Sequence, residues 1–503
     1  SASPLIVNAT FVNNTATESG PALYQGTYKA DEPHGNDPTI INSIVWGNTV
    51  ETFGSSAIYN WAESSPNISY SIVEGGYLGE GNLDVDPLFN DAANGDYTLA
   101  TGSPAINAGS SDDMLLSTDI DGLTRIDGYD LGAFESGTTA DTIASAEEVQ
   151  ALLADLMAAD ESGEVAEAPS DGEGVENAGD AWAGLVMQTE AESFAIPSNV
   201  IFVNATNSSG PGDGASWETA YPTVQEGIDA VSALGGEVWI AAGTYSVPDS
   251  TDRSSSITLQ EYVALYGGFS GTETSRDERN PDTNTTILSG DIGVAGDATD
   301  NAYHVVTGAS YAILDGLTIS DGYADGEGMH RHGGGLINYI GVNSLMIDDV
   351  TFSNNYAFEG GAIYSFYFGY VVIDNSLFDS NSADYGGAIY SNVAANSLVD
   401  NTVFSNNYAK YRGGAGVLDY GAGGTFNNSI FDSNTTDGKG GAVWTDTRAS
   451  QVDYTTATFD NCTFNDNSAQ FYGGAVHNYN LTIMTIMNSS FSDNSAERGA
   501  AIG

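Results

Sequence analysis

Short apolar runs, separated by glycine, asparagine and aspartate, recur along the second half of the chain. From about residue 318 one unit repeats every 26 or 27 residues in most places, with a single spacing of 33. Each unit carries Phe-X-X-Asn, followed by a pair of small residues. A period of this length is typical of stacked units, and the runs are too short for helices. The pattern predicts an all-β, right-handed parallel β-helix, in which each strand pairs with its equivalent one rung away.

Stacking places like residues on like, so we expect phenylalanine over phenylalanine inside and a ladder of asparagines at one corner. Asparagine tolerates the left-handed backbone of a tight corner, and its amide can bond the neighbours above and below. The predicted ladder comprises Asn14, Asn355, Asn381, Asn407, Asn434, Asn467 and Asn494. The small pair, as in Gly440-Gly441, is predicted to form another corner, where a Cβ atom would crowd the backbone.

The last copy of the unit stops half-way, and the opening residues of the chain continue it. Gly499-Ala-Ala-Ile-Gly503 followed by residues 1–14 matches residues 387–407. The sequence therefore predicts a junction at which the head completes the rung interrupted at Gly503. Three arrangements satisfy it: the head folds back on its own tail, docks on a neighbouring molecule, or follows in a longer tandem chain. The junction residues are Leu5, Val7, Phe11, Phe491, Ala501 and Ile502.

Five regions follow from these patterns: terminal rungs (1–75), a cap (76–136), an acidic linker or strap (137–196), the start of the β-helix (197–300) and regular rungs (301–503). A capping helix is predicted over 223–234, because Thr223 and Glu226 form a capping box and Gly235 stops the helix. A second helix is expected from about Ser145 to Ala159.

Three motifs in residues 70–135 closely resemble the choice-of-anchor Q domain, which closes many bacterial and archaeal β-helix surface proteins. They are Asp86-Pro-Leu-Phe, Gly102-Ser-Pro-Ala-Ile-Asn-Ala-Gly and Asp130-Leu-Gly-Ala-Phe-Glu. The rung motifs are also similar to those of the chlamydial polymorphic outer-membrane proteins, which are β-helical adhesins. The resemblances imply a surface protein with a cap near 76–135.

The chain has 11 basic and 68 acidic residues, a net charge of −57. Clustered cations are what phosphate binding requires, so nucleic acid is excluded as a partner and anionic membranes are disfavoured. One cysteine, Cys462, permits no internal disulfide. No run is long and apolar enough to insert directly into a membrane. The composition favours an extracellular or cell-surface protein.

Candidate chemistry is sparse. Asp119, Asp121, Asp127 and Asp130 lie close together among glycines, and hard oxygen ligands of this kind suit calcium. Calcium is thus the one cofactor that the sequence suggests, with turn-forming aspartates as the alternative. Arg331 is the candidate base of a pectate-lyase-type enzyme, but no carboxylate cluster accompanies it by spacing. No catalytic residues are assigned, and we expect no enzyme.

Several charged and aromatic residues stand at or near the position before the small pair. They predict a column along one edge, held by salt bridges and cation–π stacking or serving as a glycan- or partner-binding stripe. Its members are His332, Glu359, Tyr385, Arg412, Lys439, Tyr472 and Arg498. Glycosylation sequons include Asn8, Asn67, Asn204, Asn434 and Asn488.

The leading functional hypothesis is a structural subunit of an extracellular filament or surface fibre. Residues 1–75 of one subunit or repeat would stack on the open rung near Gly503 of another, giving a head-to-tail homopolymer. The alternative is a surface adhesin that binds glycans, and the third is a polysaccharide lyase or hydrolase.

Overall fold

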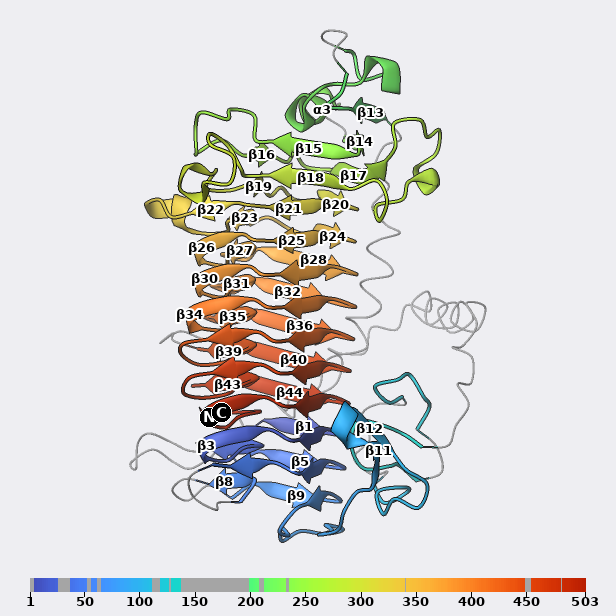
Figure 1. Ribbon diagram of the computed structural model, residues 1–503, viewed down its shortest axis with the longest axis vertical. Helices are drawn as coiled ribbons and strands as arrows, with labels where there is room; N and C mark the ends of the chain where they lie inside the picture. Colours follow the sequence, from blue (N-terminus) through green and yellow to red (C-terminus); the bar gives the residue numbers. More distant parts are fainter. Residues whose placement is uncertain are drawn as a thin grey trace, which may run out of the picture.

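The computed structural model describes residues 4–25, 37–51, 56–60, 65–110, 118–125, 128–136, 199–207, 212–231, 235–339, 341–447, 454–480 and 482–503. Its strands stack into one long rod (Figure 1). All pairings between rungs are parallel and in register in the part described, apart from local shifts. The predicted all-β parallel β-helix is confirmed.

Four sheets run along the rod. Sheet A contains 13 strands. They are β13 (Val200–Val203), β14 (Gly236–Ala241), β17 (Val263–Phe269), β20 (Ile313–Asp315), β24 (Leu345–Asp348), β28 (Tyr370–Asp374), β32 (Asn396–Val399), β36 (Gly423–Asn427), β40 (Thr456–Asp460), β44 (Ile483–Met487), β1 (Leu5–Val7), β5 (Thr39–Ile41) and β9 (Asn67–Ser69). With strands about 4.8 Å apart, this sheet is about 58 Å long.

Sheet B contains 12 strands. They are β15 (Gly243–Ser246), β18 (Thr286–Ser289), β21 (Thr318–Ser320), β25 (Thr351–Ser353), β29 (Leu377–Asp379), β33 (Val403–Ser405), β37 (Ile430–Asp432), β41 (Thr463–Asn465), β45 (Ser490–Ser492), β2 (Thr10–Val12), β6 (Ile44–Trp46) and β10 (Ile72–Val73).

Sheet C contains nine strands: β22 (Tyr323–Ala324), β26 (Tyr356–Glu359), β30 (Ser382–Tyr385), β34 (Tyr408–Arg412), β38 (Thr435–Thr436), β42 (Ser468–Ala469), β46 (Ser495–Arg498), β3 (Thr15–Ser19) and β7 (Thr49–Val50). Sheet D contains eight: β16 (Ile257–Thr258), β19 (Val306–Thr307), β23 (Leu336–Tyr339), β27 (Ile363–Phe366), β31 (Ile389–Asn392), β35 (Gly416–Asp419), β39 (Val443–Asp446) and β43 (Val476–Tyr479). On the same side lie β4 (Leu23–Gln25) and β8 (Ile58–Asn60).

One continuous core fills the rod from end to end. Its inner column of phenylalanines stacks with ring centroids 4.6–4.9 Å apart and nearly parallel planes, from Phe352 through Phe491. The small-residue corner forms because Gly440 has a φ of +70°. A Cβ atom on Gly441 would lie 1.9 Å from the carbonyl oxygen of Gly474, which explains the requirement for glycine.

Both outer ends of the rod are covered in the described structure. At one end α3 (Val224–Ala230) packs on β13 and β14, and the Thr223 hydroxyl accepts a hydrogen bond from the Glu226 amide. This helix is shorter than the predicted 223–234, because Val231 already has extended backbone; residues 232–234 lie outside the described residues. At the other end Tyr77 packs against the core and Leu83 bridges to Ile72.

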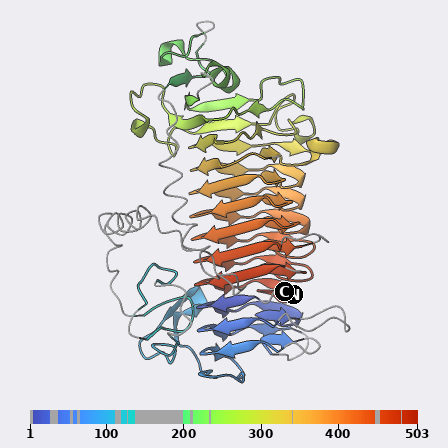
Figure 2. The same cartoon turned by 180° about the vertical axis from the view of Figure 1, so that it is seen from behind.

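The predicted cap also covers a flank. Its antiparallel strands β11 (Phe89–Asp91) and β12 (Asp96–Leu99) lie beside the rungs of β1, β5 and β9 (Figures 1 and 2). Leu99, Ala105 and Leu131 form a second small core with Ile44 and Ile72. The acidic segment 137–196 and its predicted helix lie outside the described residues.

Candidate functional site

The rung junction is where residues 4–25 meet residues 482–503, and the structure brings all six predicted junction residues to it. Leu5 and Val7 of β1 pair with Thr485 and Met487 of β44. Phe11 of β2 pairs with Phe491 of β45, and the two rings stack at 4.9 Å and 13°. The amides of Ala501 and Ile502 donate to the carbonyls of Pro21 and Ala22 at 2.9 and 3.1 Å. The junction has the geometry of the other rungs.

Both sides of this junction belong to one chain in the structure, and β1, β2 and β3 lie beside β44, β45 and β46 (Figure 1). Of the three arrangements left open by the sequence, the structure has the head folded on its own tail. The rung interrupted at Gly503 is therefore completed without a second molecule.

The asparagine ladder crosses the junction. Each Nδ2 donates to the Oδ1 of the next asparagine at 2.9–3.1 Å, from Asn355 to Asn494 and on to Asn14. Asn48 extends the ladder by one rung at 2.9 Å, a member that the Phe-X-X-Asn motif missed because Val45 stands in place of phenylalanine. All seven predicted members are fully buried.

One detail of the ladder prediction is wrong. The left-handed backbone belongs to the residue before each ladder asparagine, for example Asn406 at φ +55° and Ser433 at φ +56°, and not to Asn407 or Asn434. The preceding residue makes the turn, and this leaves the ladder amide pointing along the rod, where it bonds its neighbours.

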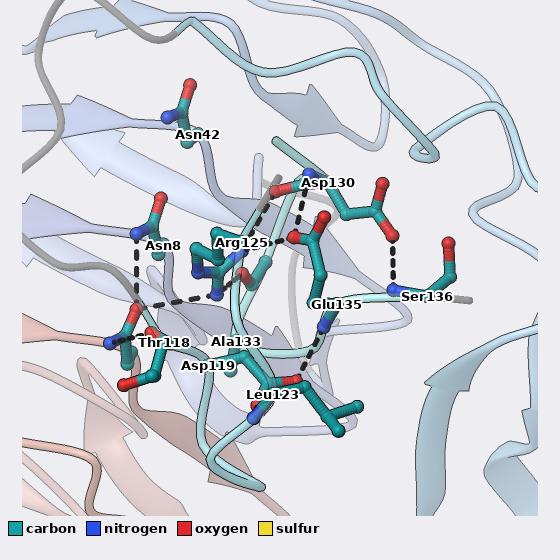
Figure 3. Close-up of polar contacts among 12 residues, drawn as sticks. Asn8, Asn42, Thr118, Asp119, Leu123, Arg125, Asp130, Ala133, Glu135 and Ser136 are labelled. Atoms are coloured by element: carbon teal, nitrogen blue, oxygen red, sulfur yellow. Dashed lines mark hydrogen bonds and ion pairs between the residues drawn. The ribbon is translucent and has the colours of Figure 1, made fainter. Parts of the chain in front are cut away.

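The cap contacts both sides of the junction, the tail through a buried arginine and the head through a backbone amide (Figure 3). The Arg125 guanidinium pairs with Glu135 at 3.1 Å and donates to the Asn488 amide oxygen at 3.4 Å. That oxygen also accepts a hydrogen bond from Asn8 Nδ2 at 3.1 Å. The backbone amide of Ala133 donates to Thr10 Oγ1 at 2.9 Å. We call residues 118–125 and 128–136 the clasp, because they contact both the head rungs and the tail rung.

The clasp keeps an ion pair buried from solvent. Arg125 and Glu135 side chains are at most 3% exposed. Burial raises the pKa of Glu135 to about 7, although Arg125 and a backbone hydrogen bond oppose the rise. Removing the arginine would leave this carboxyl buried without its cation, which is strongly destabilising.

The side-chain carboxylates of two of the four predicted calcium ligands accept hydrogen bonds from backbone amides in and around the clasp. Asp119 accepts hydrogen bonds from the amides of residues 121, 123 and 135, and Asp130 accepts from those of residues 107 and 136. Asp121 is exposed, and Asp127 lies outside the described residues. Within the described ranges no group of three or more acidic, histidine or cysteine side chains is arranged to hold a metal ion. Calcium at this place stays a prediction.

Three of the predicted glycosylation sites are wrong, because their asparagine side chains are buried. Asn8, Asn434 and Asn488 are at most 2% exposed, and each amide nitrogen donates a hydrogen bond inside the fold. The folded chain has no room for a glycan at these positions. Asn67 is exposed and Asn204 is partly exposed, so both stay predictions.

The predicted charged and aromatic residues form one column, the edge column: His332, Glu359, Tyr385, Arg412, Lys439, Tyr472 and Arg498, paired rung to rung. It covers an outward-facing apolar cluster on sheet D that contains Tyr364, Tyr390 and Trp444. The Arg412 guanidinium lies 4.3 Å from the Trp444 ring, and Arg498 donates to the Tyr472 hydroxyl at 2.6 Å.

A pair of buried carboxyl groups on the same face was missed from the sequence. Asp419 and Asp446 pair on adjacent strands and are at most 2% exposed. Burial, then the neighbouring Asp446, raises the pKa of Asp419 to about 7. Tyr390 donates to Asp419 at 3.0 Å and Asn480 donates to Asp446 at 2.6 Å. Two aspartates 27 residues apart are common in this sequence, so spacing alone could not single them out.

The candidate enzyme residue packs against an aromatic ring. Arg331 lies 3.4 Å from the Phe358 ring centroid, and nearby Asp325 is paired with Arg253 at 2.7 Å. Elsewhere a hollow of about 480 Å³ is lined by Tyr266, Arg276 and Arg279, among others. Arg276 bonds Tyr266, and Arg279 pairs with Asp315, so both arginines already have partners.

A family model described as "Right handed beta helix region" matches residues 335–502, which agrees with the predicted handedness. No curated protein matches the chain in sequence. Two crystal structures of the pectin methylesterase from Aspergillus niger, one deglycosylated and one penultimately deglycosylated, are similar at a TM-score of 0.27 and 13% identity. They cover 59–60% of this chain and 86–87% of theirs.

A likeness at this TM-score carries no argument about activity. The resemblances to the choice-of-anchor Q domain and to chlamydial surface proteins stay predictions, as does the absence of enzymatic activity. In the part of the chain described, no helix is long and apolar enough to cross a membrane.

Proposed function

We propose that this protein is a non-enzymatic structural subunit of an extracellular fibre, assembled through the rung junction. The observation that supports the proposal is that the junction is an ordinary rung made from two separate stretches of chain. Its strand pairs, its Phe11–Phe491 stack and its Asn494–Asn14 bond involve only residues 4–25 and 482–503. The head of a neighbouring molecule would fit the same tail rung in the same register.

Concentration would decide which head occupies the tail. The segment 137–198 connects the clasp to residues 199–503, which we call the body. The head, residues 4–25, therefore stays near the tail, residues 482–503, of its own chain. Tethered partners have effective concentrations of the order of millimolar. We therefore expect closure within one chain in dilute solution, and exchange of heads where chains are crowded on a surface. Exchange is a heterologous contact, which produces open filaments when it does not close.

The test compares assembly at low and high concentration. The denatured protein is refolded at about 1 µM, far below the effective concentration, and at about 1 mM, close to it, and is then sized by light scattering and imaged by electron microscopy. Single particles of 52.3 kDa are expected when dilute, and multimers or filaments when concentrated. Single particles at both concentrations would refute the assembly role.

Two variants show whether multimers use the junction. Phe11→Ala removes a ring from the junction, and Phe378→Ala removes a ring from the same stack inside the body, where the ring spacings are 4.8 and 4.9 Å. Both create a cavity of the same chemistry, so they lose similar stability. Closed monomers and multimers use the same Phe11 contact, so only Phe11→Ala should raise the fraction of undocked heads in both forms. Equal effects would mean that the contact between molecules lies elsewhere.

A further inference from the structure

We propose that the corner between sheets D and A binds an uncharged polysaccharide along a ridge of exposed aromatic rings. Each turn of this corner connects a strand of sheet D to the next strand of sheet A, from β16 and β17 to β43 and β44. We call it the aromatic corner. The ridge lies on the side of a single rod, so the inference does not depend on the assembly role.

Left-handed backbone recurs at every corner of the rod. Within residues 199–503, the described left-handed positions at the other three corners are glycine, asparagine, aspartate or serine, as in Gly440, Asn375 and Asn406. Turns favour these residue types, and glycine and asparagine tolerate the conformation best. The aromatic corner differs, because five aromatic residues have left-handed backbone there. They are Tyr262 (φ +63°), Tyr311 (φ +60°), Tyr367 (φ +54°), Phe368 (φ +61°) and Tyr420 (φ +54°).

The backbone of the aromatic corner does not require aromatic residues. Gly421 and Asn480 have left-handed backbone in other turns of the same corner, at φ +77° and +51°. A bulky side chain is strained in this conformation, because its Cβ atom approaches the following carbonyl oxygen. Strained residues of this kind cluster at binding and active sites. The rings are therefore present at this corner against the preference of its backbone.

Burial does not account for the rings. Tyr262 is 40% exposed, Tyr367 46% and Phe368 57%, which makes Phe368 the most exposed aromatic residue in the described part of the chain. Tyr262 stacks on Tyr311 at 5.1 Å, whereas Tyr367 and Phe368 meet edge to face at 4.9 Å on one rung. Tyr339, on the preceding rung, adds a further ring that is 38% exposed. A group of large exposed rings marks a contact surface.

The rings follow the rod at intervals that suit a polymer. Tyr262 and Tyr311 precede adjacent strands of sheet A, β17 and β20. Tyr367 precedes β28, two rungs further on, and Tyr420 precedes β36, another two rungs away. With rungs about 4.8 Å apart, the four backbone positions fall at about 0, 5, 14 and 24 Å along the rod. The flat C–H faces of successive sugar rings can stack on such a series, whereas a compact ligand would contact only one or two members.

The charge at this corner favours an uncharged ligand. Although the chain has 68 acidic and 11 basic residues, four of the turn segments contain no charged residue. These segments are 308–312, 341–344, 367–369 and 393–395. Asp419, before Tyr420, is buried, and Glu261 is exposed beside Tyr262 at one end of the ridge. The four segments offer no cation to an anionic polymer, and the net charge of −57 repels both polyanions and a second copy of the chain.

Sugar hydroxyl groups also need hydrogen-bonding partners. Asn343 and Asn396 are exposed on the rungs before and after that of Tyr367. A side-chain amide both donates and accepts hydrogen bonds, which matches the hydroxyl groups of a sugar. Aromatic faces with neighbouring amides thus provide both kinds of contact that a neutral sugar makes.

The test is affinity electrophoresis of the full chain in native gels that contain hydroxyethylcellulose, laminarin or polygalacturonate. The first two polymers are uncharged glucans, and polygalacturonate is the anionic comparison. We expect retardation by at least one of the two glucans and none by polygalacturonate. Titration calorimetry with the retarding glucan should give the same affinity at low and high salt, because salt screens interactions between charges.

The double variant Tyr367→Asn/Phe368→Gly separates binding from folding. It introduces residue types that other turns carry at left-handed positions, so the urea midpoint should stay equal or rise. The affinity for the glucan should fall about tenfold or more. Tyr411→Asn/Phe471→Asn is the matched control, because it removes a tyrosine and a phenylalanine of similar exposure, 42% and 40%, on the side of sheet C. This control should bind like the unmodified protein.

Several results would overturn the proposal. They are no retardation by either glucan, retardation by polygalacturonate, an affinity that falls as salt rises, undiminished binding by Tyr367→Asn/Phe368→Gly, or equal loss of binding by the control. A lowered urea midpoint of Tyr367→Asn/Phe368→Gly would also overturn it, because the rings would then support the fold. Association of dilute unmodified chains that this variant abolishes would identify a second copy as the occupant instead.

Discussion

Replacing Asn434 by alanine tests the asparagine ladder at its interior. Four hydrogen bonds disappear with the side chain. Asn434 Nδ2 donates to the Phe404 carbonyl at 2.9 Å and to Asn467 Oδ1 at 3.0 Å. Its Oδ1 accepts from the backbone amide and the side-chain amide of Asn407 at 3.1 and 2.9 Å.

The loss can be worked out from the groups left behind. Three buried groups lose a partner: the Phe404 carbonyl, the Asn407 backbone amide and one hydrogen of the Asn407 side chain. Each unsatisfied buried group costs about 1–3 kcal/mol, so we expect Asn434→Ala to lower the free energy of unfolding by at least about 3 kcal/mol. Asn434 is fully buried, and water cannot replace these bonds without opening the corner.

Asn406→Ala is the matched control, because Asn406 is exposed and its side chain makes one bond, to Asp379 at 2.9 Å. Its left-handed backbone disfavours alanine, so the expected loss is about 1–2 kcal/mol, smaller than that of Asn434→Ala. The assay is urea unfolding followed by circular dichroism, with the slope compared among variants. A loss for Asn434→Ala no larger than that of the control would refute the view that the ladder stabilises the rungs.

Three further changes test other parts of the account. Because the pKa of Asp419 is raised from 3.8 to about 7, the folded state holds this proton more tightly. The free energy of unfolding therefore falls as pH rises from about 4 to about 7. The urea midpoint of Asp419→Asn should fall less over this pH range than that of the unmodified protein. An equal fall in both proteins would contradict this. Arg125→Met leaves Glu135 buried without its cation and should lower the free energy of unfolding by about 3–5 kcal/mol. A protease should then cleave residues 4–136 before it cleaves residues 199–503. Simultaneous cleavage of both parts would contradict the role of the clasp in holding the head on the tail. Gly440→Ala places a Cβ atom 2.4 Å from the Val443 carbonyl oxygen and should lower the thermal midpoint, whereas an unchanged midpoint would show that the corner can relax.

The repeated features were predictable from sequence because each one recurs at a fixed place in the unit. Phe-X-X-Asn identifies both an inward ring and a corner amide, and parallel stacking then dictates their partners. The edge column was found in the same way, from what precedes the small pair. Asn48 escaped because its rung has Val45 in place of phenylalanine, although its amide occupies the same position.

Features that occur only once could not be predicted from the sequence. Arg125 reaches Asn488, 363 residues away, and no period relates the cap to the rungs. The aspartates of the cap suggested a metal because clustered carboxylates suit calcium, whereas Asp119 and Asp130 mainly satisfy backbone amides. The occupant of the tail rung was also undetermined, because strand pairing specifies register and not the molecule that supplies the strand.

The most direct measurement of the central claim, that the head completes the tail rung in register, is a disulfide across the junction. Thr15 and Ser495 pair on adjacent strands, as do Ser468 and Ser495 within the body. Neighbouring strands place Cα atoms about 5 Å apart, within disulfide range. In dilute solution, Thr15→Cys/Ser495→Cys should oxidise to a cross-linked monomer as readily as the control Ser468→Cys/Ser495→Cys. A control that oxidises while the junction pair stays reduced would contradict the account.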